Sequence, residues 1–399
     1  MKVALVHDYI KEYGGAERVL EALHEIYPDA TVFTSVYLPQ FLGPHQERFK
    51  GWKVKTSWFQ HVPFNHKLIS PFRLIAPWVF KSFDLSDFDV VIVSSTGAYF
   101  PNMIKTKKSN VIARKNDEAT SSTRLPRSLQ SLAMTEREGT VHICYCHTPP
   151  RYLYGYATAR EWKKHKLVAA LAGVANHFLR MVDFRAAQNV DFYIANSQEI
   201  ASRIKKFYRK NSTVIYPPVD ISKKKPIPYN LAPNPYFLTG GRLARAKHVD
   251  LIVRACSELG VPLKVFGKSF AGYGEELKEM AGPTVEFLGE VSDEEKAELM
   301  AGAKAFLFAS EDEDFGIIPV EAMGYGVPVI AHHSGGVKET VLEGKTGTFF
   351  EKLTVDDLKK AIKRFEKLKI DPNECREQAE KFSKARFQRQ IREFVSSAL

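Results

Sequence analysis

The sequence lacks long apolar runs and has little cysteine. No apolar run among its 399 residues approaches the length of about 20 residues that a membrane-spanning helix needs. The N-terminal MKVALVHDYI resembles a strand, and no apolar segment typical of a signal peptide follows it. Four cysteines are too few for a disulfide framework. We therefore expect a cytoplasmic protein with reduced thiols.

Nucleotide-cofactor and metal signatures are also scarce. No G-x-G-x-x-G follows a predicted first strand, which counts against a dinucleotide oxidoreductase. Cys144 and Cys146 alternate in the strand-like HICYCH with no second cysteine pair at zinc spacing, so packing is favoured over ligation. Residues 312–314 form a D-x-D, a three-residue match too short to establish a metal–diphosphate site. The prediction is that no metal and no cofactor are required.

Charge is plentiful and mostly positive, with a net charge of +11. Such a balance suits nucleic acid, anionic membranes or phosphorylated ligands. Nucleic-acid binding needs aromatic residues among the basic ones, and the basic segment 104–139 has none, so no nucleic-acid partner is expected. Residues 64–83 and 159–171 do mix Lys and Arg with aromatic residues, which predicts weak contact with anionic membranes; helices packed in the core are the alternative for the first segment.

Strand-like apolar runs alternate with amphipathic helical patterns along most of the chain, which is typical of the α/β class with parallel sheets. The alternation breaks in a proline- and lysine-rich linker at 214–235 and then resumes. We expect two Rossmann-like, doubly wound domains, at 1–217 and 218–380. Residues 104–139 are predicted to be an insertion in the first domain. The ligand of such a protein is expected in the cleft between the domains.

The segment EDEDFGIIPVEAM crowds acidic residues between a strand and a helix. Glu313 falls in the loop, and Glu321 falls within the helix. The backbone N–H groups at the start of this helix, those of Phe315, Gly316, Ile317 and Ile318, should lack helical partners. A carboxylate beside such donors can bind sugar hydroxyls, and a second one can bind a ribose. The alternative is that Glu321 forms a cap or salt bridge and that solvent surrounds the other acids.

Three further groups are candidates for the same site. Arg242 and Lys247 stand at a helix start after a predicted strand, as in a diphosphate site, although ordinary helix-flanking charges fit too. Gly14 and Gly15 follow the first strand and would allow a close approach of backbone to a phosphate or sugar. His147 ends the strand HICYCH, where it could contact a substrate or serve only the structure.

Together these segments resemble glycosyltransferase family 4. The resemblance rests on the E-x7-E segment EDFGIIPVE, on GRLARAK and on GGAERV. The stretches VHDYI, HICYCHTPPRY, FYIANSQEIASRI, VIYPPVDI and ECREQAEKFS are similar to the WbaZ-like mannosyltransferase branch. The resemblance implies the GT-B fold, with two Rossmann-like domains facing each other across a cleft and a C-terminal helix, within 381–399, that crosses back to the first domain.

The resemblance also implies roles for these residues. Glu313 would hold the donor sugar with the amides of residues 315–318, and Glu321 would bind the ribose. Arg242 and Lys247 would neutralise the diphosphate, which Gly14 and Gly15 would approach from the first domain. His147 would contact the transferred sugar. The nucleobase is expected near Gly267, Lys268 and Val291, in the loops VFGKS and GEVSDEE.

The resulting expectation is a retaining, metal-independent hexosyltransferase of polysaccharide or glycolipid biosynthesis. GDP-mannose is the expected donor and a glycan or lipid-linked glycan the acceptor, with the enzyme peripheral on the inner face of a membrane. A UDP-sugar donor stays open, and a nucleotide-sugar epimerase or a phosphorylase is the alternative enzyme class. Because Glu313 is expected in a loop at the end of a strand, its replacement should cost little stability.

Overall fold

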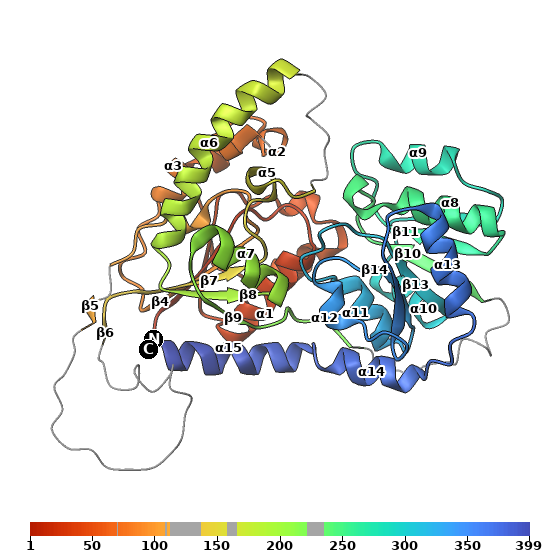
Figure 1. Cartoon of the computed structure of the whole chain (residues 1–399). Coiled ribbons are helices and arrows are strands. Elements are labelled where there is room, and N and C mark those ends of the chain that lie inside the picture. The colour runs from red at the N-terminus through yellow and green to blue at the C-terminus, as the bar shows by residue number, and fades with distance from the viewer. Residues whose placement is uncertain (70, 108–109, 112–136, 158–165, 222–234) are drawn as a thin grey trace, which may run out of the picture.

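The computed structural model describes residues 1–399 except 70, 108–109, 112–136, 158–165 and 222–234. Its described residues form two parallel sheets, each covered by helices on both faces, joined by the linker (Figure 1). This is the α/β architecture that the alternating pattern predicts. Most of the segment 104–139 and of the linker lies outside the described residues. In the described part of the chain no helix is long and apolar enough to span a membrane.

The first sheet has seven strands in the order β3-β2-β1-β4-β7-β8-β9. All its neighbours pair in parallel, and the central strands are buried along their whole length, which explains their continuous apolar sequences. The strands are β1 (Val3–His7), β2 (Thr31–Thr34), β3 (Val54–Thr56), β4 (Val90–Ser95), β7 (Val141–Cys146), β8 (Phe192–Ala195) and β9 (Ser212–Val214).

Helices of the first domain cover both faces of this sheet. The α-helices are α1 (Gly15–Ile26), α2 (Asn65–Leu68), α3 (Ala76–Lys81), α5 (Arg151–Tyr154), α6 (Lys166–Gln188) and α7 (Gln198–Tyr208). Short 3-10 helices lie at η1 (Pro39–Phe41), η2 (Gly43–Phe49), η3 (Trp58–His61), η4 (Pro71–Leu74) and η5 (Pro101–Met103). Two short strands within the segment 104–139, β5 (Asn110–Val111) and β6 (Arg137–Glu138), pair in antiparallel orientation.

The second sheet has six strands in the order β12-β11-β10-β13-β14-β15. They are β10 (Tyr236–Gly240), β11 (Leu263–Phe266), β12 (Val285–Gly289), β13 (Ala303–Phe308), β14 (Val329–His332) and β15 (Gly347–Phe350). The helices here are η7 (Arg245–Lys247), α8 (Val249–Leu259), α9 (Tyr273–Glu279), α10 (Asp293–Ala301), α11 (Ile317–Gly324), α12 (Val337–Thr340), α13 (Val355–Phe365) and α14 (Pro372–Glu380). One large apolar core joins them.

The last helix, α15 (Lys384–Ala398), leaves the second domain after α14 and runs along the first (Figure 1). Its buried residues Phe387, Ile391 and Val395 recur every four positions and join the core around β1 and α1. Lys384 also bonds Glu25 of α1 at 2.7 Å. The helix therefore packs on the first domain, as the expected fold requires.

Candidate active site

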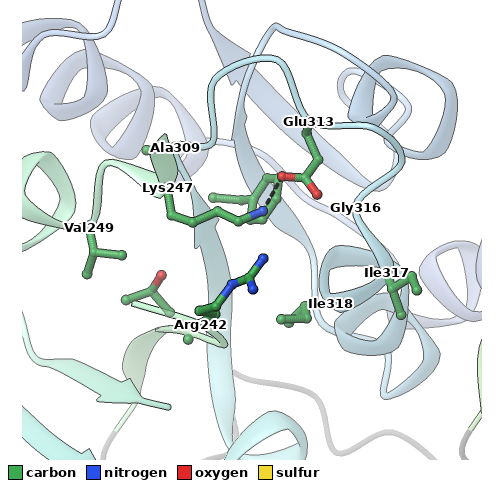
Figure 2. A pocket seen from close by; sticks show the side chains of 11 residues that line it. Arg242, Lys247, Val249, Ala309, Glu313, Gly316, Ile317 and Ile318 are labelled. Atoms are coloured by element: carbon green, nitrogen blue, oxygen red, sulfur yellow. Dashed lines mark hydrogen bonds and ion pairs between the residues drawn. The ribbon is translucent and has the colours of Figure 1, made fainter. Parts of the chain in front are cut away.

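A small pocket opens at the carboxyl ends of β10 and β13, where ligands of parallel sheets bind (Figure 2). Its volume is about 50 Å³. The lining residues come from the turn after β10, from the loop after β13 and from the first turn of α11: Thr239, Gly240, Arg242, Lys247, Val249, Phe308, Ala309, Glu313, Gly316, Ile317 and Ile318. Three of the charged candidates thus meet in one place.

Glu313 is the acidic group of this pocket. Its side chain is only 14% exposed and accepts hydrogen bonds from Lys247 Nζ and Ser310 Oγ. Burial raises the pKa of the carboxyl group, but the positive charges of Lys247 and Arg151 outweigh burial and lower the pKa to about 2. Glu313 is therefore a largely buried, ionised carboxylate in the loop after β13, where a loop acid was expected. That its loss costs little stability stays a prediction, and the pairing with Lys247 argues against it.

The first turn of α11 presents backbone donors to the same pocket. Gly316 precedes the helix in a left-handed conformation, with φ +88°. None of the N–H groups of residues 315–318 donates a hydrogen bond to another described residue. A helix N-terminus with free amides attracts anions and hydroxyl oxygens. The side chain of Phe315 points elsewhere, since its ring is buried against Tyr216 and Phe382.

Two cationic side chains lie near these donors, and they differ in how firmly other residues hold them. Lys247 is held by Glu313 and lies over the ring of Phe308. Arg242 is 55% exposed, and its nearest carboxylate, on Glu12 of the first domain, is 3.7 Å away. Figure 2 shows the Arg242 guanidinium pointing into the pocket beneath the Lys247 amine. Arg242 is thus free to turn toward an anion, whereas Lys247 is already fixed.

Glu321 lies within α11, four residues after the first residue of the helix, and is almost fully buried. Its Oε1 accepts hydrogen bonds from Arg18 of α1 and from Lys296 of α10, the latter at 3.2 Å. Burial raises its pKa, but these two cations lower it below the usual range. The salt bridge predicted as the alternative is therefore present. Oε2 accepts no hydrogen bond from any described residue, so one oxygen stays available to a ribose.

The two aspartates beside Glu313 bind the first domain. Asp314 Oδ1 lies 2.9 Å from both Arg151 and Arg203, and Arg203 is almost fully buried. The carbonyl of Asp312 accepts hydrogen bonds from the same two arginines. The alternative in which solvent surrounds the other acids therefore does not hold for Asp312 and Asp314. Their carboxylates serve the contact between domains, an arrangement unlike a D-x-D metal site.

The paired glycines of the first domain also lie at this contact. Gly14 is the N-cap of α1, and its N–H donates to Glu17 at 2.9 Å. A Cβ atom on Gly15 would lie 2.8 Å from Ile317 Cδ1, so the end of that side chain would have to shift. The absence of a side chain therefore lets α1 come up against the first turn of α11, next to the pocket.

His147 follows β7 in the first domain and is buried. Its Nε2 lies 2.9 Å from Ser94 Oγ, and its backbone N–H donates to Ser95. Burial, together with the nearby His7, lowers its pKa to about 3. The residue is a neutral imidazole at physiological pH. It is absent from the lining of the pocket described above.

The residues expected near a nucleobase lie beside the pocket. Gly267, with φ +123°, packs so closely on Gly241 that a Cβ atom would lie 1.7 Å from its carbonyl oxygen. Its N–H donates to Gly289 at 2.6 Å, which brings the loops after β11 and β12 together. Lys268 is exposed and lies 3.1 Å from Glu290, and the neighbouring Val291 is partly buried. The two predicted loops are thus adjacent.

Sequence reasoning missed the residues that act across the domain contact. Arg18, Arg151 and Arg203 each bind an acid of the second domain. Glu339 of α12 reaches in the opposite direction and accepts the N–H groups of Gln198 and Glu199 at the start of α7. The sequence held only weak signals for these contacts. Arg18 lies within GGAERV and Arg151 within TPPRY, but neither segment indicates which acid the arginine binds.

Comparison with known proteins agrees with this geometry. The family model of glycosyl transferases group 1 matches residues 222–382. The chain is 32% identical over 193 residues to mouse alpha-1,3/1,6-mannosyltransferase ALG2, covering 40% of this chain and 46% of the relative. It is 33% identical over 149 residues to the GDP-mannose-dependent alpha-(1-6)-phosphatidylinositol monomannoside mannosyltransferase of Mycolicibacterium smegmatis, covering 34% and 39%.

The sequence matches cover only part of each chain, whereas the structural similarity extends over the whole chain. The chain spans about half the length of the first curated relatives it matches. Anabaena HepE, solved in complex with UDP and glucose, superposes with a TM-score of 0.67 at 19% identity, covering 100% of both chains. At this identity the likeness shows the fold alone. The chain thus has the GT-B fold, and its residues 222–382 match the family model of glycosyl transferases group 1.

Proposed function

We propose that the protein is a glycosyltransferase that transfers a hexose from a sugar nucleotide. One observation carries the proposal: Glu313, Lys247, Arg242 and the free amides of α11 line one pocket at the carboxyl edge of the second sheet. A carboxylate beside donors suits the hydroxyls of a sugar. Two cations beside a helix N-terminus suit the diphosphate to which that sugar is attached.

The charges favour cleavage of the bond between sugar and phosphate. As this bond breaks, positive charge develops on the sugar ring and negative charge on the diphosphate. Arg242, Lys247 and the α11 amides would stabilise the diphosphate without any metal. Glu313, already ionised, would hold the sugar by its hydroxyls. Glu321 Oε2 would accept a hydrogen bond from the ribose, and Arg18 would orient the carboxylate from the first domain.

We propose that the reaction retains the anomeric configuration. The acidic groups around the pocket are engaged by cations, so neither Glu313 nor Glu321 is placed as a free nucleophile. The acceptor oxygen would bond to the anomeric carbon on the face that the diphosphate leaves. The proton of the acceptor hydroxyl would pass to the departing phosphate oxygen, which balances the reaction.

GDP-mannose is the donor we propose. Support comes from the mannosyltransferase relatives, one of which is described as GDP-mannose-dependent. HepE, with the same fold, is described in complex with UDP and glucose, so the fold itself favours neither base. Gly267 and Lys268 lie where the base would bind, but their side chains carry no group selective for guanine.

The acceptor is proposed to be a glycan or lipid-linked glycan at an anionic membrane surface. The first domain exposes Phe64 and Trp78, the latter to 66%, near Lys67 and Lys81. Other aromatic residues of the same segment, such as Phe80, are buried in the core. Within the described residues of the segment 64–83, some aromatic side chains are exposed, which supports the proposed membrane contact, and others pack in the core. The second predicted segment, 159–171, lies entirely outside the residues whose side chains the structure describes.

Incubation with a panel of sugar nucleotides tests the proposal. Wild type and the Glu313→Gln variant would each receive GDP-mannose, UDP-glucose, UDP-galactose and UDP-N-acetylglucosamine, and release of nucleoside diphosphate would be measured. We expect slow hydrolysis of GDP-mannose by wild type and none by the variant. If no sugar nucleotide is cleaved and none raises the melting temperature, the proposed function is wrong.

A further inference from the structure

A buried chain of hydrogen bonds runs through the first domain to His147. Glu17 of α1 lies 3.4 Å from Nε2 of His7 at the end of β1. Nδ1 of His7 lies 3.1 Å from both the carbonyl oxygen and the hydroxyl oxygen of Ser94 in β4. The same hydroxyl lies 2.9 Å from Nε2 of His147. His7 and Ser94 are completely buried, so solvent cannot complete their hydrogen bonds.

The chemistry of each atom fixes the direction of these bonds. A carbonyl oxygen only accepts, so the proton lies on Nδ1 of His7. Ser94 Oγ therefore faces an N–H group on one side and directs its own proton toward Nε2 of His147. The opposite arrangement would aim two N–H groups at one hydroxyl and leave its buried proton without an acceptor, which is costly.

Glu17 strengthens this direction from the other end. Its Oε1 accepts from Nε2 of His7, while its Oε2 is held by the N–H of Gly14 at 2.9 Å. Burial lowers the pKa of His7, but Glu17 outweighs it and the net shift is upward. A His7 ring that carries protons on both nitrogens keeps Nδ1–H directed at Ser94. It also keeps the neighbouring His147 neutral.

We propose that His7 and Ser94 are positioning residues that hold His147 as the neutral tautomer with its proton on Nδ1. This inference rests on the proposed function for its substrate: His147 would donate an Nδ1–H hydrogen bond to an oxygen of the sugar in the cleft. It would not act as a proton acceptor, because Nε2 is occupied by Ser94. No described residue hydrogen-bonds to Nδ1, so that donor is left for a bound molecule.

Nuclear magnetic resonance reads the tautomer directly, without any substrate. The protein would be labelled with ¹⁵N-histidine, and the signals of His147 would be assigned by their loss in His147→Asn. We expect Nδ1 to show the shift of a protonated nitrogen and Nε2 that of an unprotonated one. A proton on Nε2 in the wild type would overturn the proposal.

Matched variants of neighbouring serines test the role of the chain. Ser94→Ala should move the His147 proton partly or wholly to Nε2 and lower the transfer rate about tenfold with little change in donor KM. Ser94→Thr keeps the hydroxyl and should restore both. Ser95→Ala is the control, since the Ser95 hydroxyl makes no contact with His147. Thermal melting would establish that each variant is folded.

The two readouts separate this inference from the proposed function. A His147 tautomer unchanged by Ser94→Ala would reject the positioning role. A changed tautomer with an unchanged transfer rate would also reject it. If the tautomer shifts as expected but wild type transfers no sugar, the proposed function has failed while the buried chain still fixes the proton of His147.

Discussion

Two helices, α1 and α11, begin after glycines near the carboxyl edges of their sheets and meet across the domain contact, yet the charges at their first turns differ. In α1 the first turn contains Glu17, whose carboxylate bonds Gly14 and His7. In α11 the first turn has no acidic side chain, and Lys247 and Arg242 stand in front of it.

The difference supports the proposal that the second domain binds the diphosphate. A diphosphate at α1 would meet a negative charge within the first turn, whereas at α11 it would meet free amides and two cations. Gly15 brings α1 close without placing a side chain in the way. In the proposed site the second domain would supply the charge, and the first domain would supply a close surface and His147. The predictions below test this division, from the largest expected effect to the smallest.

Loss of the pocket carboxylate should have the largest effect. Glu313→Gln keeps the shape of the side chain but removes the charge that holds Lys247 and would hold the sugar. We expect transfer to fall by about 10³-fold, comparable to the loss of a strong charge-stabilising group. Initial rates with the natural or a surrogate acceptor measure it. An active Glu313→Gln enzyme would contradict the site assignment.

The two cations should come next and should differ from each other. Lys247→Ala and Arg242→Ala are each expected to lower the rate by about 10²-fold through weaker stabilisation of the leaving group. Lys247→Ala should cost more stability than Arg242→Ala, because Lys247 binds the largely buried Glu313, whereas Arg242 is half exposed and lies 3.7 Å from Glu12. Excess EDTA should leave the wild-type rate unchanged; inactivation that manganese reverses would instead favour metal-assisted chemistry.

The free energy of unfolding of the ligand-free protein should fall at acid pH as Glu313 becomes protonated. A carboxyl group whose pKa is lowered from 4.5 to about 2 on folding stabilises the native state by about 3 kcal/mol above pH 5. This contribution is lost as the pH falls from about 4.5 to 2. Urea unfolding of wild type and Glu313→Gln should differ at pH 7 and converge near pH 2. Parallel stability curves across this range would contradict the pairing.

The contact between domains should tolerate less change than surface ion pairs. Arg203→Met removes a buried guanidinium that binds Asp314 and the Asp312 carbonyl, and we expect a loss of roughly 3 kcal/mol. Lys50→Ala removes an exposed ion pair with Glu47 and should change stability by less than about 1 kcal/mol. Equal melting temperatures for the two variants would show that the arginine contact is not structural.

Features set by neighbouring residues could be predicted from the sequence, whereas contacts between residues far apart in the sequence could not. Parallel sheets and the start of α11 follow from local patterns, so they were predicted, and the terminal helix was expected from the resemblance. β15 (Gly347–Phe350) was missed because its four residues begin with the last glycine of EGKTG and are too few to show a strand pattern. The partners of Asp314 and Glu321 could not be predicted, since Arg203 and Arg18 are distant in sequence and only the docking of two domains brings them together.

Membrane contact should give the smallest effect. Phe64→Ser with Trp78→Ser removes two exposed aromatic side chains, and Leu399→Ser removes an exposed apolar residue elsewhere as a control. Sedimentation with vesicles rich in anionic lipid should recover less of the double variant than of the control, and added salt should release wild type. Binding that ignores anionic lipid would contradict the proposed surface.

Calorimetric titration with nucleoside diphosphates tests the division between the two helices most directly. Wild type should bind one GDP, and Arg242→Ala should weaken binding at least tenfold, which corresponds to about 1.4 kcal/mol, while Lys50→Ala should not. If UDP binds at least tenfold more tightly than GDP, the pocket stands but the GDP-mannose assignment is wrong. If neither nucleotide binds, or if Arg242→Ala binds as wild type does, the anion site is not at α11 and the account is contradicted.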